Sequence, residues 1–167
     1  MKTQAKKIAF LGVLTTLALV LSYVEAILPP LYSAVPGVKM GLPNIIIIFM
    51  LYRFGIKETA VVSLIRVGIV TMLFGNFMML AYSLAGALLS LLIMAVLKKT
   101  DRFSTMGVSV AGGVFHNLGQ VLVAMVLLDS AQIGYYMLVL AITGTIAGGF
   151  IGLAGAYALK RTEKLKI

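Results

Sequence analysis

Long apolar runs, separated by short polar or charged segments, make up almost the whole 167-residue chain. The longer runs have about 20 residues, and at about 1.5 Å per residue a helix of that length crosses the roughly 30 Å hydrocarbon core of a bilayer. The pattern predicts a compact bundle of six transmembrane helices. These helices are expected at about residues 8–28, 42–54, 59–74, 77–97, 104–128 and 134–159.

The first two runs carry additional information about processing and shape. Lys2, Lys6 and Lys7 precede the first run, as in a signal peptide, but the run continues past Ser22 without a clear cleavage site, so we expect a retained helix. A proline-containing loop to about residue 40 follows. The second run is only about 20 Å long as a helix. A helix that short leaves room for a cavity above it.

Composition places the chain in a bilayer. Hydrophobic residues make up 61% of the sequence and charged residues 11%, against roughly half and a quarter in an ordinary soluble domain. So few charged side chains cannot cover a water-exposed surface, and we expect one all-α integral membrane domain over residues 1–167. The chain contains no cysteine, which excludes a disulfide framework and a thiolate metal site.

Basic residues are distributed unevenly between the two sides of the predicted bundle. If both termini are cytoplasmic, 12 of the 14 lysines and arginines lie on the inner side, Lys39 lies in an outer loop and Arg66 lies inside a span. The positive-inside rule therefore favours a multi-pass cell-membrane protein with cytoplasmic termini. The net charge of +9 follows from this topology and gives no support to nucleic-acid binding, although the basic face favours anionic lipids.

Two rows of small residues indicate close helix contacts. Gly144, Gly148 and Gly152 recur every four residues in the sixth predicted helix, and internal packing of the bundle is the favoured interpretation. A second row near the start of the first helix is open to two interpretations, because a partner can dock there or the neighbouring lysines can simply anchor the helix. That candidate docking row consists of Ala5, Ala9, Gly12 and Thr16.

A polar cluster interrupts the apolar run of the fifth predicted helix. His116 and Gln120 are four residues apart and so share one helical face, with Asn117 beside them. In their neutral forms all three side chains donate and accept hydrogen bonds, which suits a site for a polar ligand. The alternative is that they bond across the bundle and hold helices together, which is less expected for three clustered residues than for one.

Arg66 lies in the middle of another apolar run, where an ionised group costs about 3 kcal/mol or more unless it is compensated. Its guanidinium group presents five donors in a planar fork that matches a carboxylate or a phosphate. Glu25 is the one acid inside a predicted span, so an ion pair with Arg66 and direct ligand binding are both open. In this topology Glu25, Asn44 and Asn76 lie in the outer half and are also candidate substrate-binding residues.

Several common activities have no support in the sequence. No G-x-x-x-x-G-K-[ST] motif is present, so the chain does not bind ATP through a P-loop. Asp101 and Asp129 are its two aspartates and lie apart, so the paired acids that a magnesium-diphosphate enzyme needs are absent. A single histidine without cysteine does not form a metal site. We therefore expect no enzyme activity, no cofactor and no metal.

Four sequence blocks stand out beside Arg66: GLPNII (41–46), LFGNF (73–77), YSLAGALL (82–89) and GVSVAGGVFHNLGQ (107–120). Together with Arg66, these blocks resemble the Gx transporter family, whose members are often labelled heptaprenyl diphosphate synthase component I. That family is similar to the substrate-binding S components of energy-coupling factor (ECF) transporters. The resemblance implies a six-helix protein that captures a scarce micronutrient from outside and docks on an ECF coupling subunit carrying two ATPases.

Two classes of function stay open at this point. The first is a substrate-binding subunit for a small, anionic micronutrient or precursor, favoured by the outer polar residues and by the absence of a P-loop. The second is a non-catalytic membrane partner of isoprenoid or quinone synthesis, which is suggested by the family label alone. Co-purification with an ECF coupling subunit would support the first, and co-purification with a soluble synthase would support the second.

Overall fold

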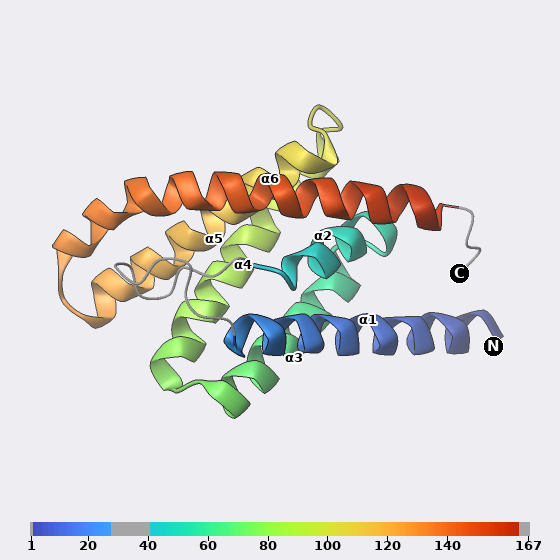
Figure 1. Ribbon diagram of the computed structural model, residues 1–167, viewed down its shortest axis with the longest axis horizontal. Helices are drawn as coiled ribbons and strands as arrows, with labels where there is room; N and C mark the ends of the chain where they lie inside the picture. Colours follow the sequence, from blue (N-terminus) through green and yellow to red (C-terminus); the bar gives the residue numbers. More distant parts are fainter. Residues whose placement is uncertain (1, 28–40, 164–167) are drawn as a thin grey trace.

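The computed structural model describes residues 2–27 and 41–163, and this part of the chain is helical throughout its regular structure (Figure 1). The predicted loop before residue 41, including Lys39, lies outside the described residues, as do Lys164 and Lys166. The elements are α1 (Lys2–Ile27), α2 (Asn44–Arg53), α3 (Ile56–Phe74), α4 (Phe77–Lys99), α5 (Thr105–Leu127), the 3-10 helix η1 (Ala131–Tyr136) and α6 (Met137–Thr162).

The helices begin and end within three residues of the predicted positions, except at the start of α1. α1 begins at Lys2 rather than at residue 8, because lysine and alanine are good helix formers and extend the helix beyond its apolar part. α6 begins at Met137 rather than at residue 134, because η1 occupies the turn before it. Elsewhere polar caps fix the ends: Ser104 accepts a hydrogen bond from the Gly107 amide at the start of α5.

Four of the helical segments are long and apolar enough to cross a membrane. They are Gln4–Ile27, Phe77–Lys99, Thr105–Leu127 and Ala131–Thr162. α2 has only 10 residues, and α3 carries Lys57, Glu58 and Arg66 among its 19. The prediction of an all-helical integral membrane bundle is therefore confirmed, with four helices that have the length and composition of a span and two that complete the bundle.

α5 lies between α4 and α6 and makes its most extensive contacts with these two helices (Figure 1). Small residues let the backbones approach. A Cβ atom added to Gly113 would lie 2.5 Å from the Gly144 carbonyl oxygen, and one added to Gly148 would lie 2.7 Å from the Cα atom of Val110. Interpretation of the glycine row on α6 as internal packing is confirmed, because close backbone approach is what such rows provide between membrane helices.

α2 fills the half of the bundle nearest the chain termini. Ile48, Met50 and Leu51 are almost completely buried, and the Cγ2 atom of Ile48 occupies the space above Gly155 on α6. The ammonium group of Lys98 donates to the Leu51 carbonyl oxygen at 2.6 Å, which satisfies one of the carbonyl groups left open at the end of α2. α2 is short and closely packed, so the part of the apolar core that it fills extends no further than its first residue, Asn44.

α1 has two different faces. Leu14, Ala18 and Ser22 are buried against the bundle, and near its first turns Lys7 forms a 2.5 Å ion pair with Glu58 of α3. The predicted docking row lies on the other face. Its members, which are all exposed, are Ala5, Ala9, Gly12 and Thr16.

Candidate binding cavity

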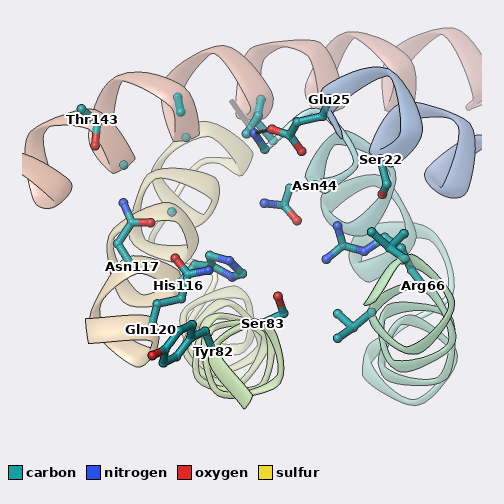
Figure 2. Close-up of a pocket in the computed structure, with 18 of the residues that line it drawn as sticks. Ser22, Glu25, Asn44, Arg66, Tyr82, Ser83, His116, Asn117, Gln120 and Thr143 are labelled. Carbon is teal, nitrogen blue, oxygen red and sulfur yellow. Dashed lines mark hydrogen bonds between the residues drawn. The ribbon is translucent and has the colours of Figure 1, made fainter. Parts of the chain in front are cut away.

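A cavity of about 180 Å³ opens beyond the first residue of α2 and is bordered by all six α-helices (Figure 2). Ten of the lining residues carry polar or charged side chains drawn and labelled in Figure 2. They are Ser22, Glu25, Asn44, Arg66, Tyr82, Ser83, His116, Asn117, Gln120 and Thr143.

The cavity lies toward the end of the bundle opposite the two chain termini. Its walls come mainly from the C-terminal halves of α1, α3 and α5 and from the N-terminal parts of α2, α4 and α6. Because consecutive helices run in opposite directions, these halves meet at one end, and the start of α1 and the end of α6 lie toward the other (Figure 1). The short helix α2 lies between the cavity and the opposite end of the bundle, as expected from its length.

Arg66 is the cationic side chain among the described residues that line the cavity. Its Nε atom is buried and has no hydrogen-bond partner within the described residues. Figure 2 shows its guanidinium group pointing into the cavity, toward Asn44 and His116. A buried donor without a partner costs roughly 1–3 kcal/mol, more for a charged group, so Arg66 is an energetically costly residue at this position.

Glu25 lines the same cavity, near the end of α1. Its carboxylate accepts a hydrogen bond from the Gly41 amide, and Gly41 has a φ of +75°, a left-handed conformation that favours glycine. Glu25 acts on Arg66 by charge attraction. Within the described part of the chain, however, no ion pair shorter than 4 Å joins the two side chains. The two charged side chains therefore line the same cavity without a direct ion pair between them.

His116 and Gln120 line the cavity from one face of α5, as their spacing predicts. A glycine on α4 makes this possible: a Cβ atom added to Gly86 would lie 3.0 Å from both the His116 Cε1 atom and the Gln120 Cγ atom. On the other side of the same crossing, Gly119 approaches the Ala85 carbonyl carbon and oxygen. Close packing of α4 on α5 therefore holds the two side chains at the cavity wall.

Asn117 has a structural contact in addition to its place in the lining. Its Nδ2 atom donates to the Leu140 carbonyl oxygen of α6 at 2.6 Å. A Cβ atom at Gly144 would lie 2.9 Å from the same Nδ2 atom, so the amide group occupies a space that α6 leaves open. Asn117 therefore forms a hydrogen bond between two helices, which was the alternative to ligand binding.

Asn44 and Asn76, the two outer asparagines, have different positions. Asn44 is the first residue of α2 and lines the cavity. Asn76 is exposed and lies outside the lining, where its side chain accepts a hydrogen bond from the Met79 amide and caps α4. The structure thus brings six of the seven predicted binding residues to one cavity, and it gives Asn76 a capping contact instead.

Hydroxyl groups that were not predicted also line the cavity. Ser22 and Thr143 are bonded to backbone carbonyl oxygens of their own helices, while Tyr82 and Ser83 lie at the wall formed by α4. Tyr82 and Ser83 are adjacent polar residues in an apolar run, which is a signal that the sequence offered. Among residues 2–27 and 41–163, no three His, Cys, Asp or Glu side chains gather in a way that could hold a metal.

The fold and the cavity define a class: a multi-pass helical membrane protein with a polar, charge-bearing cavity enclosed by its helices. Residues 14–158 match the model of the heptaprenyl diphosphate synthase component I family, and the chain belongs to this family. The matched region contains every residue that lines the cavity. Neither the curated proteins nor the solved structures gave a match.

Proposed function

We propose that this chain is a membrane-embedded substrate-binding subunit, comparable to the S component of an ECF transporter, for uptake of a small anionic micronutrient or precursor. The observation that carries the proposal is Arg66, a membrane-depth cation that lines the cavity and directs its guanidinium group into it (Figure 2). An intramembrane charge of this kind marks a site of function more often than a packing contact.

In this proposal the ligand binds because its polar groups match the polar side chains that line the cavity. A carboxylate or similar anion supplies the acceptors that the Arg66 guanidinium group needs, while His116, Gln120 and Asn44 supply hydrogen bonds that fix its orientation. Buried polar groups of this kind discriminate strongly, because a molecule that lacks the matching groups leaves them unsatisfied.

The direction of capture follows from charge and topology. Basic residues gather at the end of the bundle that holds both termini, among them Lys7, Lys99 and Arg161, and the positive-inside rule assigns this end to the cytoplasm. In that orientation the cavity lies toward the outer face, so the protein takes its ligand from outside the cell.

The sequence contains no P-loop, so in this proposal the energy of ATP hydrolysis comes from other subunits. We assign the coupling contact to the exposed row on α1, where a Cβ atom added to Gly12 would meet nothing within 4 Å. A flat surface of small residues permits close approach of another membrane helix. The row lies on the face of α1 opposite buried Ser22, so docking of an ECF coupling subunit and its ATPases leaves the cavity wall in place.

Native mass spectrometry of the detergent-purified protein tests the binding function directly. We expect a retained small molecule on the wild-type chain and none on Arg66→Met, which keeps a similar apolar volume without the charge. The matched control is Arg102→Met, which removes an exposed cation from the α4–α5 loop and should leave retention unchanged. Normal retention by Arg66→Met would overturn the proposal.

A second candidate function has one supporting observation, the name of the family. It is a non-catalytic membrane partner in heptaprenyl diphosphate synthesis. A catalytic role for this chain in that reaction lacks support, because Glu25 is the one acid among the described cavity residues, whereas magnesium-diphosphate chemistry uses carboxylates in groups. Affinity purification under mild conditions separates the candidates: an ECF coupling subunit and ATPases favour the first, and a soluble prenyl synthase favours the second.

A further inference from the structure

The α3–α4 turn (residues 72–77) is apolar and exposed, although it connects two helices at one end of the bundle. Met72 is 89% exposed and Phe77 is 81% exposed. Residues 67–97, which contain the turn and most of its two arms, include no Asp, Glu, Lys, Arg or His. A cluster of exposed apolar side chains marks a surface that interacts with something other than water.

The connection between α5 and η1, at the same end of the bundle, has a different composition. It carries Asp129, Ser130 and, in the first turn of η1, Gln132. Asp129 and Gln132 are exposed, which is the usual position of such side chains in contact with water. The two connections therefore face different surroundings.

The length of α3 places its end at membrane depth. Lys57 lies in the charged first turn of α3, and the rise from Lys57 to Phe74 is about 25 Å, less than the roughly 30 Å hydrocarbon core. Along the direction of α6, the α3–α4 turn ends short of the connection between α5 and η1 (Figure 1). The ring of Phe74 packs 5.6 Å from the ring of Tyr23 on α1, and tyrosine is enriched at the boundary between lipid and water. The turn therefore lies no higher than this boundary.

The exposed side chains surround the end of α3 and do not form one face. Met72, Leu73 and Phe74 are consecutive and all exposed, and successive residues of a helix point about 100° apart. Phe77 adds a further ring from the start of α4. A helix of a partner protein packs closely on small residues along one side, whereas these side chains are large and point in several directions. Lipid chains, which surround a membrane protein, fit this distribution.

Hydrogen bonds within the turn make it compatible with lipid. The Gly75 amide donates to the Thr71 carbonyl oxygen at 2.9 Å, and the Asn76 side chain accepts from the Met79 amide at 2.9 Å. Such bonds matter because an unsatisfied backbone group costs several kcal/mol in hydrocarbon. The backbone of the turn can thus lie at the level of the lipid headgroups while its apolar side chains lie among the acyl chains.

We propose that the α3–α4 turn inserts into the membrane leaflet opposite the first residues of α1, and that lipid acyl chains cover its apolar side chains. The proposal does not depend on the binding function. It brings lipid next to one wall of the cavity, because Val70 and Met79, on either side of the turn, line that cavity.

Tryptophan fluorescence tests the proposal, because the chain contains no tryptophan and a single introduced one reports its own surroundings. Phe77→Trp exchanges one exposed aromatic ring for another. Gln132→Trp, at an exposed position of η1, is the matched control. Each full chain is reconstituted in vesicles of phosphatidylcholine and phosphatidylglycerol, with or without bromine on the phosphatidylcholine acyl chains. We expect brominated lipid to remove most of the fluorescence of Phe77→Trp and little of that of Gln132→Trp, and iodide on both sides of the membrane to do the reverse.

Met72→Trp provides a second position in the turn if Phe77→Trp does not fold, and the same result is expected. Quenching of the turn variants by iodide and not by brominated lipid would place the turn in water and overturn the proposal. Quenching by neither agent would show that protein covers the turn, and an equal response of the turn and the control would remove the difference between the two connections; each result also overturns it. Ligand retention is measured separately on Arg66→Met, so failure of this proposal leaves the binding function standing.

Discussion

The contact between α5 and α6 makes a quantitative prediction at two adjacent glycines. Gly148→Ala places a methyl group 2.7 Å from the Cα atom of Val110 and 2.8 Å from the Ser109 carbonyl oxygen, both of which belong to backbone. Gly149→Ala places the same group 3.5 Å from the flexible end of Met106, an ordinary contact distance. The two variants therefore make the same chemical change at adjacent positions of one helix, and they differ in what the new methyl group meets.

The expected magnitude follows from these distances. Both variants gain about 1 kcal/mol of helix propensity by replacing glycine with alanine, and this gain cancels in the comparison. Overpacking against backbone costs about 1–3 kcal/mol, and a chain of this length shifts its melting temperature by about 2–4 °C per kcal/mol. Gly148→Ala should therefore melt about 2–12 °C below Gly149→Ala.

Thermal unfolding of both variants in one detergent, at one scan rate, measures this difference. A ligand-retention measurement accompanies it, because Gly148 also lines the cavity and displacement of α6 would stretch the hydrogen bond from Asn117 to Leu140. Equal melting temperatures for the two variants would show that α6 does not approach α5 as closely as the structure has it.

Three further predictions test the site, the topology and the partner contact. His116→Ala should weaken ligand binding with little change in melting temperature. Asn117→Ala should instead reduce the free energy of unfolding by roughly 0.6–1.7 kcal/mol, the contribution of a hydrogen bond between membrane helices, and so lower the melting temperature first. The opposite result for the two variants would exchange their roles. A cysteine at Lys39 should react with an impermeant thiol reagent in intact cells and one at Lys99 should not, and reversed labelling would contradict cytoplasmic termini. Gly12→Leu should abolish co-purification of the coupling subunit while ligand retention stays normal, and unchanged co-purification would place docking elsewhere.

Much of the fold could be predicted because the membrane simplifies the pattern. Apolar runs bounded by charged residues or by glycine and proline gave the helices, since a chain in lipid must satisfy its backbone groups within each helix. The extension of α1 to Lys2 was missed because charged residues next to an apolar run are easily interpreted as a flank, although lysine favours helix. The 3-10 helix η1 has no apolar periodicity that would distinguish it from a loop.

Candidate site residues could be predicted where a polar or charged side chain is energetically unfavourable in lipid. Arg66, Glu25 and His116 stand out in apolar runs, and the structure brings them to one cavity. Ser22 did not stand out, because a serine hydroxyl bonded to the carbonyl oxygen four residues earlier is tolerated on any face of a membrane helix. Asn76 was assigned to the site from its depth, yet an asparagine directly before an apolar run is also a helix-capping signal.

The walls of the cavity differ in how much substitution they can accept. α5 meets α4 and α6 through backbone contacts, so a change of residue size at Gly86 or Gly113 disturbs the architecture itself. Val70 and Thr71 of α3 line the cavity and are only partly buried. We therefore expect their exchange for larger or smaller side chains to cost the fold less than a change at Gly86 or Gly113. Under the proposed binding function, selection or protein engineering at these two positions would change which molecule fits beside Arg66 while the remainder of the bundle stays as it is.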